Sequence, residues 1–311
     1  MCPSSTSTAA SAVSREPMSV VGHQEYAAGG PTVRRMQLGA RLRRLREAKG
    51  ISREDAGWTI RASESKISRM ELGRVGFKER DVDDLLTLYG VADHMERGEL
   101  ITLARETNQP GWWHPYGDLL PTWFQYYLDL ESAASLIRTY EIQFVPGLLQ
   151  TEEYARAVID IGFSESGLRE VDRRVELRMA RKRVLDRAGA PRVWAVIDEA
   201  VLCRPIGGAR VLRGQIEALA EVSEQPGVRL QVVRFRSGGH AAAGGAFSIL
   251  RFPEQELPDV VYLEHLTSAL YLDKREEVDR YAAAVGRLFI EADPPDRTRD
   301  VLHRALRDLR R

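Results

Sequence analysis

Residues 52–73, SREDAGWTIRASESKISRMELG, constrain the fold more than any other segment of the chain. Ser52 and Ser63 stand where a side-chain oxygen can cap a helix, so the segment predicts two short helices joined by a tight turn. A steep crossing of these helices requires a small residue on the first, which Gly57 supplies. The shared buried face consists of Ile60, Ile67 and Met70. We therefore expect a helix-turn-helix whose second helix, residues 64–72, can enter a major groove about 12 Å wide.

The side chains that point outward from this second helix are of the kinds that read base edges or hold phosphate. They are Glu64, Ser65, Lys66, Ser68 and Arg69. The alternative is a purely structural helix pair, which we consider less consistent with a pattern that matches at so many positions.

Residues 36–91 resemble the Xre family of phage-repressor-like helix-turn-helix proteins. The stretches that carry the resemblance are LGARLRRLREAKGIS and SESKISRMELGR. The resemblance implies an all-α, lambda-repressor-like domain in which Glu64 begins the recognition helix. It also implies that Ser65, Lys66 and Arg69 face the bases of double-stranded DNA.

Three further basic residues are candidates for contacts with the DNA backbone. Arg53 opens the first helix of the pair, where a side chain and a helix N-terminus can meet phosphate, and Arg74 and Lys78 follow the recognition helix. Arg61 departs from the family pattern, because members usually carry glycine at this turn position. An arginine with a left-handed φ costs about 1–2 kcal/mol, so the turn could relax into another geometry.

The charge distribution is uneven although the whole chain is neutral. Residues 34–90 carry a net charge of +5, whereas residues 91–311 carry −4 and residues 1–33 carry −1. A basic domain is the electrostatic footprint of a polyanion partner. A solvated helical surface explains this charge equally well when it is taken alone.

The cysteine content and hydropathy place the expected protein in the cytoplasm. Cys2 and Cys203 are the two cysteines, too few for a disulfide framework or a four-thiolate zinc site. No run of 18 apolar residues occurs, and residues 1–12 lack the pattern of a secretory signal. We expect no membrane contact.

The composition and hydrophobic pattern of the sequence predict five segments. Residues 1–33 are poor in large apolar side chains and are expected to form a disordered tail. The helix-turn-helix domain occupies 34–92, a helical connector 93–118, a larger α+β domain 119–295 and a C-terminal helix 296–311. In the larger domain we expect helices at 122–136, 151–161, 168–186, 209–222, 275–289 and 298–309, and strands at 140–144, 193–197, 228–233, 247–252 and 260–263.

The larger domain resembles the C-terminal domain of WhiJ-like regulators, which are Xre-family proteins. The resemblance begins at GWWHPYGDLLPTWFQYYLDLESAASLIRTYEIQFVPGLLQTEEYARAVI and continues through RVWAVIDEAVLCRPIGG and VVYLEHLTSALYLDKREEVDRYAAAVGRLF. It implies a transcriptional regulator, often paired with a small acidic partner protein in an antitoxin-like arrangement, and it does not imply a known catalytic activity.

Two features of this domain receive structural interpretations. The aromatic cluster is expected to dock the two domains and fill the core, and it consists of Trp112, Trp113, Trp123, Phe124, Tyr126 and Tyr127. The arginine-rich helix from Leu168 is expected to be a solvated face with intrahelical pairs to Glu170, Asp172 and Glu176. Contact with nucleic acid or with a second copy is the alternative.

No catalytic, metal-binding or cofactor-binding motif is present, so we expect neither an enzyme nor a cofactor. Asp198, Glu199 and Glu264 flank predicted strands, where catalytic acids often lie, but capping or pairing with arginine is the preferred interpretation.

The expected function is a sequence-specific DNA-binding regulator. It would act as a homodimer that places two recognition helices in successive major grooves, and the larger domain would dimerise and receive a small-molecule effector or a protein partner. Two alternatives stay open. One is an antitoxin-like protein that neutralises a small partner, and the other is an enzyme domain fused to a DNA-binding domain.

Overall fold

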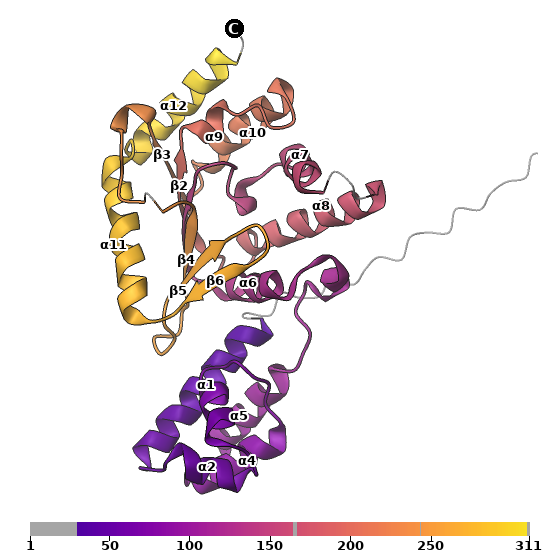
Figure 1. Cartoon of the computed structure of the whole chain (residues 1–311), viewed down its shortest axis with the longest axis vertical. Helices are drawn as coiled ribbons and strands as arrows, with labels where there is room; N and C mark the ends of the chain where they lie inside the picture. Colours follow the sequence, from indigo (N-terminus) through magenta and orange to yellow (C-terminus); the bar gives the residue numbers. More distant parts are fainter. Residues whose placement is uncertain (1–29, 164–166, 243, 310–311) are drawn as a thin grey trace, which may run out of the picture.

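The computed structural model describes residues 30–163, 167–242 and 244–309 and shows two units joined end to end (Figure 1). We call them the helical unit and the sheet domain. The helical unit contains α1 (Pro31–Ala48), α2 (Arg53–Thr59), α3 (Glu64–Glu71), α4 (Glu79–Leu88) and α5 (His94–Glu106). The expected fold class, an all-α helix-turn-helix domain followed by a larger α+β domain, is confirmed.

The helical unit forms because its caps and its apolar spacing agree. The hydroxyl oxygens of Ser52 and Ser63 accept hydrogen bonds from the Asp55 and Lys66 amides, at 3.0 and 3.2 Å. The apolar faces of the helices meet in one core, whose members include Leu38, Leu42, Ile67, Met70, Phe77, Val82 and Leu86. Leu100 and Ala104 of α5 belong to this core, so α5 packs as part of the helical unit rather than as a connector.

The first helix begins earlier than the sequence predicts. α1 starts at Pro31, which fits the first turn because its missing N–H has no helical partner there. Thr32 and Val33 are buried, and Val33 lies in the core of the sheet domain. The expectation of disorder is therefore wrong for residues 31–33, because burial against a distant segment outweighs their local composition. Residues 1–29 lie outside the described residues.

The sheet domain is built on a six-stranded mixed sheet in the order β3-β2-β1-β4-β5-β6. Its strands are β1 (Leu136–Glu141), β2 (Arg192–Asp198), β3 (Val228–Val233), β4 (Phe247–Arg251), β5 (Val260–Glu264) and β6 (Ala269–Leu272). β1, β2 and β3 run parallel to one another, whereas β4 to β6 pair antiparallel. β1 pairs with both β2 and β4, so it joins the two halves of the sheet.

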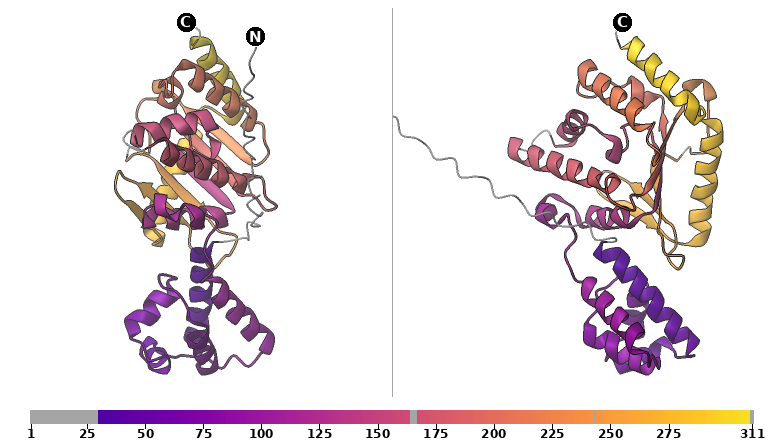
Figure 2. Two further views of the ribbon diagram at one scale, coloured as in Figure 1. Left: turned by 90° about the vertical axis from the view of Figure 1, so that its right-hand side faces the viewer. Right: turned by 180° about the vertical axis from the view of Figure 1, so that it is seen from behind.

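Helices cover both faces of this sheet (Figure 2). α11 (Arg275–Glu291) covers one face and forms a core with Tyr140, Val196 and Ile249. The helices on the other face are α6 (Thr122–Ala133), α7 (Glu152–Gly162), α8 (Leu168–Lys182), α10 (Ala209–Val222) and α12 (Pro295–Asp308). Short turns complete the domain, namely η1 (His114–Leu119), η2 (Gly147–Leu149), η3 (Arg183–Leu185), α9 (Ala200–Cys203) and η4 (Phe235–Ser237). α12 contributes Val301 and Leu302 to the larger core, so it packs as part of the sheet domain.

Most expected elements of the sheet domain are present, with three local differences. The helix predicted at 122–136 ends at Ala133, and β1 begins at Leu136, four residues before the predicted strand at 140–144. Leu136 and Ile137 pair with both neighbouring strands, which local helix propensity does not reveal. β6 was not predicted, because four residues are too few to show an alternating pattern.

No helix among the described residues is long and apolar enough to cross a bilayer. Within the same residues, no group of three His, Cys, Asp or Glu side chains could hold a metal ion.

Candidate nucleic-acid interface

The turn between α2 and α3 is tight. A Cβ atom on Gly57 would lie 2.6 Å from the Ala62 carbonyl oxygen, so the close crossing of the two helices requires glycine at this position. The Ala62 amide donates to the Gly57 carbonyl at 2.8 Å. Arg61 keeps a left-handed φ of +56°, so the alternative of a relaxed turn is wrong. Closing this turn therefore holds one non-glycine residue in a costly conformation.

α3 presents a polar face to solvent. Glu64, Ser65 and Arg69 are exposed, and Ser68 is half-buried. Ile67 and Met70 face the core, which sets the rotation of the helix about its axis. The helix ends at Glu71, with Leu72 as its C-cap, one residue short of the predicted range of 64–72. The outward positions predicted from the sequence therefore lie on one surface, except for Lys66.

Lys66 is turned toward a neighbouring helix. Its Nζ lies 3.3 Å from Asp81 Oδ2, and Asp81, in the first turn of α4, is buried. The Lys66 side chain is 35 % exposed. Its ammonium group is thus partly neutralised in the DNA-free protein and must leave or share this carboxylate to reach a base or a phosphate.

Arg53 belongs to an ion-pair cluster around a buried carboxylate. Glu71 accepts hydrogen bonds from Arg46 at 2.5 and 3.1 Å and from Arg53 Nε at 3.1 Å. Arg46 also donates to the Ile51 carbonyl at 2.8 Å, which ties α1 to the segment before α2. Burial, and then the Glu71 charge, raise the pKa of Tyr89. Arg53 therefore positions α2 against α3. Its side chain is 36 % exposed, and only this exposed part is available to contact a phosphate.

The remaining basic residues that are candidates for DNA contact differ in whether a carboxylate already pairs with them. Nη2 of Arg74 lies 3.9 Å from Oδ2 of Asp273, which follows β6 in the sheet domain. Lys78 is exposed at the N-cap of α4. Arg69, Lys78 and Arg61 form no ion pair within residues 30–163, 167–242 and 244–309. Arg61 was not predicted as a contact, although its place in the turn beside α3 gave the signal.

The helical unit is attached to the sheet domain by α1 as well as by the chain between α5 and η1. The Thr32 hydroxyl donates to Asp129 Oδ2 at 2.7 Å, and the Trp113 indole donates to Asp129 Oδ1 at 2.8 Å. Burial raises the pKa of Asp129, which lies in α6. Further along α1, Gln37 donates to Glu254 at 2.5 Å. The aromatic cluster packs in and against the core of the sheet domain, as expected, and Trp113 shares Asp129 with Thr32 of α1. We call the contacts of Asp129 with Thr32 and Trp113 the α1 latch.

The arginine-rich helix differs in part from its interpretation as a solvated face. Arg174 does pair with Glu170 at 2.7 Å. Arg181, however, is buried and makes a two-pronged ion pair with Glu131 of α6 at 2.5 and 2.7 Å. Arg178 also turns inward and donates to Gln150 at 2.7 Å. Burial lowers the pKa of Arg178 to about 10. This side of α8 is thus an internal polar contact and not a nucleic-acid surface.

The carboxylates that flank strands have structural partners. Glu199 pairs with Arg234 at 2.8 Å, and Asp198 accepts from the Ala200 amide at 2.8 Å. Glu264 accepts from the Tyr262 hydroxyl at 2.8 Å. Pairing with arginine is confirmed for Glu199. Asp198 binds the first amide of α9, although Glu199 is the N-cap residue, and Glu264 pairs with a tyrosine hydroxyl rather than with arginine. Glu141, at the end of β1, is different, because burial raises the pKa of its carboxyl group to about 8.

Comparison with protein families assigns each unit separately. Residues 37–100 match the family described as "Helix-turn-helix domain", which covers α2, α3 and α4 with most of α1 and α5. Residues 124–304 match the family described as "Domain of unknown function (DUF5753)", and this match spans more than half of the chain. No curated protein and no solved structure matches the chain. The chain therefore belongs to the DUF5753 family and carries a helix-turn-helix domain ahead of the family's own domain.

Proposed function

We propose that this chain is a sequence-specific, DNA-binding transcriptional regulator of the Xre type. The observation that carries the proposal is the α3 surface, where Glu64, Ser65 and Arg69 are exposed on a helix held by a buried core. Recognition helices of this motif contact base edges with their N-terminal residues. The match to a helix-turn-helix domain supports the same function. We expect such a regulator to act in the cytoplasm.

DNA contact is expected to divide between bases and phosphates. Arg69 and the Ser65 and Ser68 hydroxyls would read bases, while Lys78 and Arg61 would meet the backbone. Each phosphate that is neutralised releases counterions, so the affinity should fall steeply as salt rises. Lys66 would also contact the DNA once its ion pair with Asp81 has opened.

The test is selection of bound duplexes from a random pool, followed by titration of the winning sequence. Arg69→Ala should weaken binding to the selected duplex by about 1–3 kcal/mol and relax the preference at one base position. Arg210→Ala is the matched control, because Arg210 is 77 % exposed on α10 and pairs with Glu153 of the sheet domain, away from the helical unit. Failure to enrich any sequence, or equal effects of the two substitutions, would contradict sequence-specific recognition.

We further propose that the regulator binds as a homodimer. One copy presents a single α3, and proteins of this motif bind half-sites about one helical turn apart. A pseudo-palindromic selected sequence and a dimer mass in light scattering would support this. A monomer on an asymmetric site would contradict it.

A second candidate function is antitoxin-like neutralisation of a small acidic partner, as in the WhiJ-like regulators. The observation that favours a protein partner is the β5–β6 hairpin, where Leu266 is 99 % and Leu270 51 % exposed beside the edge strand β6. Exposed apolar residues at an unpaired strand edge are typical of protein contacts. Co-purification of an adjacent small gene product, lost in Leu266→Asp, would support this role.

We also propose that the chain has no catalytic activity. A metabolite that is bound to the purified protein and consumed on incubation would contradict this.

A further inference from the structure

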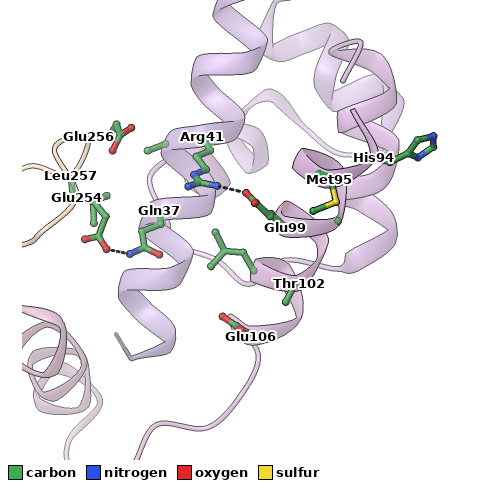
Figure 3. A pocket seen from close by; sticks show the side chains of 13 residues that line it. Gln37, Arg41, His94, Met95, Glu99, Thr102, Glu106, Glu254, Glu256 and Leu257 are labelled. Carbon is green, nitrogen blue, oxygen red and sulfur yellow. Dashed lines mark hydrogen bonds and ion pairs between the residues drawn. The ribbon is translucent and has the colours of Figure 1, made fainter. Parts of the chain in front are cut away.

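Two cavities, each of about 580 Å³, lie where the helical unit meets the sheet domain. The first is bounded by α1, α5 and the connection between β4 and β5 (Figure 3). Polar side chains that line it already contact one another, since Arg41 lies 3.9 Å from Glu99 and Gln37 donates to Glu254 at 2.5 Å. The second cavity differs, because an arginine that lines it has unfilled hydrogen-bond donors.

We call this second cavity the linker cavity. It is bounded by the start of α1, by the chain between α5 and η1, and by α6. Trp113 and Tyr126 are half-buried and form aromatic walls, and Pro31 and Pro110 also line it. Its volume lies within the range of small-molecule sites in proteins, and sites of this kind occur preferentially at domain interfaces.

Arg35 of α1 lines the linker cavity and is held through one nitrogen. Its Nε donates to the carbonyl oxygen of Thr107, the C-cap residue of α5, at 3.2 Å, which orients the guanidinium group. The two terminal nitrogens make no hydrogen bond or ion pair within residues 30–163, 167–242 and 244–309. They are not among the buried atoms that lack a partner there, so both have accessible surface. An oriented pair of N–H donors matches the two oxygens of a carboxylate.

The carboxylate beside Arg35 does not fill these donors. Among the described residues that line the linker cavity, Asp129 is the one carboxylate. Its two oxygens accept from the Thr32 hydroxyl and the Trp113 indole in the α1 latch. Because like charges repel one another, Asp129 would disfavour a second negative charge on a ligand. The lining therefore favours a monoanion over a dianion.

We propose that the linker cavity binds a small aromatic monocarboxylate. Its carboxylate group would accept from the two terminal nitrogens of Arg35, and its ring would lie against Trp113 and Tyr126. Because the walls belong to both units, the bound ligand would link α1 to α6. The inference rests on the proposed regulatory function only in calling this ligand an effector of DNA binding; the binding itself does not require DNA.

The experiment titrates 4-fluorobenzoate with the full chain, without DNA, and follows the fluorine signal of the ligand by NMR. Two other compounds share the fluorinated ring, namely neutral 4-fluorobenzamide and the dianion 4-fluorophenyl phosphate. We expect saturable binding of 4-fluorobenzoate and about tenfold weaker binding, or less, of the other two. Failure of 4-fluorobenzoate to saturate, or equal binding of either other compound, would overturn the proposal. This comparison uses the parent chain and needs no variant.

Arginine variants locate the site. Arg35→Gln removes the charge and the two-pronged contact, so it should weaken 4-fluorobenzoate binding about tenfold or more and leave 4-fluorobenzamide binding unchanged. Arg35→Lys keeps the charge without the planar fork and should give an intermediate affinity. Arg41→Gln is the matched control, because Arg41 lies on the same helix but lines the first cavity, and it should bind like the parent. Thermal unfolding of each variant shows that it is folded.

The outcomes separate this proposal from the proposed function. Equal affinity for 4-fluorobenzoate in Arg35→Gln and the parent, or an equal loss in Arg41→Gln, would overturn the carboxylate site, whatever the DNA experiments show. Loss of sequence selection by the parent chain would overturn the regulator and leave this titration intact.

Discussion

Arg61 is a non-glycine residue in a backbone conformation that favours glycine. Its side chain occupies a turn that holds a φ of +56°, a conformation that glycine adopts freely and L-residues adopt at a cost. The turn persists because Gly57 and Ala62 meet there and α3 packs behind it.

Replacing Arg61 with glycine should therefore stabilise the helical unit. We expect Arg61→Gly to raise the free energy of unfolding by about 0.5–1 kcal/mol, because the relief of strain exceeds the added freedom of the unfolded chain. Urea denaturation measures this. Arg61→Ala keeps the left-handed cost and should change stability little, so an equal gain in both variants would refute the strain.

The pairing of Lys66 with Asp81 leads to a prediction about DNA binding. Asp81→Asn frees the Lys66 ammonium group and should tighten DNA binding at low salt. The affinity should then fall more steeply as salt rises, and the slope of log affinity against log salt concentration should steepen by up to about one unit. Titrations at several salt concentrations measure it. Asp84→Asn removes the same charge from the same helix but leaves Lys66 paired. Equal changes in the two variants would show that Lys66 is not held back.

At the scale of elements, the crossing of α2 and α3 depends on one missing side chain. Gly57→Val would place carbon atoms against the Ala62 carbonyl, where even a Cβ has only 2.6 Å. We expect a loss of stability of about 1–3 kcal/mol or more, the cost typical of overpacking, together with loss of DNA binding. Thermal unfolding and a mobility-shift titration measure the two effects. Gly50→Val contacts nothing within 4 Å and tests the cost of a positive φ alone.

Local signals predicted many of the elements because their causes are local. The serine caps, Gly57 and the periodic apolar positions specify α2 and α3 before any tertiary contact is known. The start of α1, the inward turn of Arg181 and the strand β6 were not predictable in this way. The start of α1 and the inward turn of Arg181 depend on partners far along the chain, such as Glu131 for Arg181, whereas β6 is too short to show an alternating pattern.

The candidate site shows the same division. The sequence placed Glu64, Ser65 and Arg69 on an exposed face, since helical spacing decides that. It could not show that Asp81 holds Lys66 or that Glu71 holds Arg53, because these pairs form between separate helices.

At the scale of the whole molecule, the α1 latch connects the two units through a carboxyl group. Burial raises the pKa of Asp129 above its unfolded value of about 3.9. Folding therefore favours the protonated form, and the stability that this group contributes is greatest below that value. It is lost as pH rises through the folded pKa.

Two variants test this pH dependence. Asp129→Asn resembles the protonated form, so its stability relative to the parent should increase as pH rises through that window. Asp129→Ala should lose the bonds to Thr32 and Trp113 at every pH, at a cost of about 1–3 kcal/mol. Denaturation series at stepped pH values measure both, and a constant difference between Asp129→Asn and the parent would contradict the linkage.

α1 is one uninterrupted rod from Pro31 to Ala48, with Val33 embedded in one hydrophobic core and Leu38 and Leu42 in the other. Because one continuous helix belongs to both cores, no flexible joint separates them along α1, and a tilt of its N-terminal turn would be carried to α3, which packs against it. In the proposed homodimer, this rigidity would restrict the half-site separations on DNA that the two recognition helices can span.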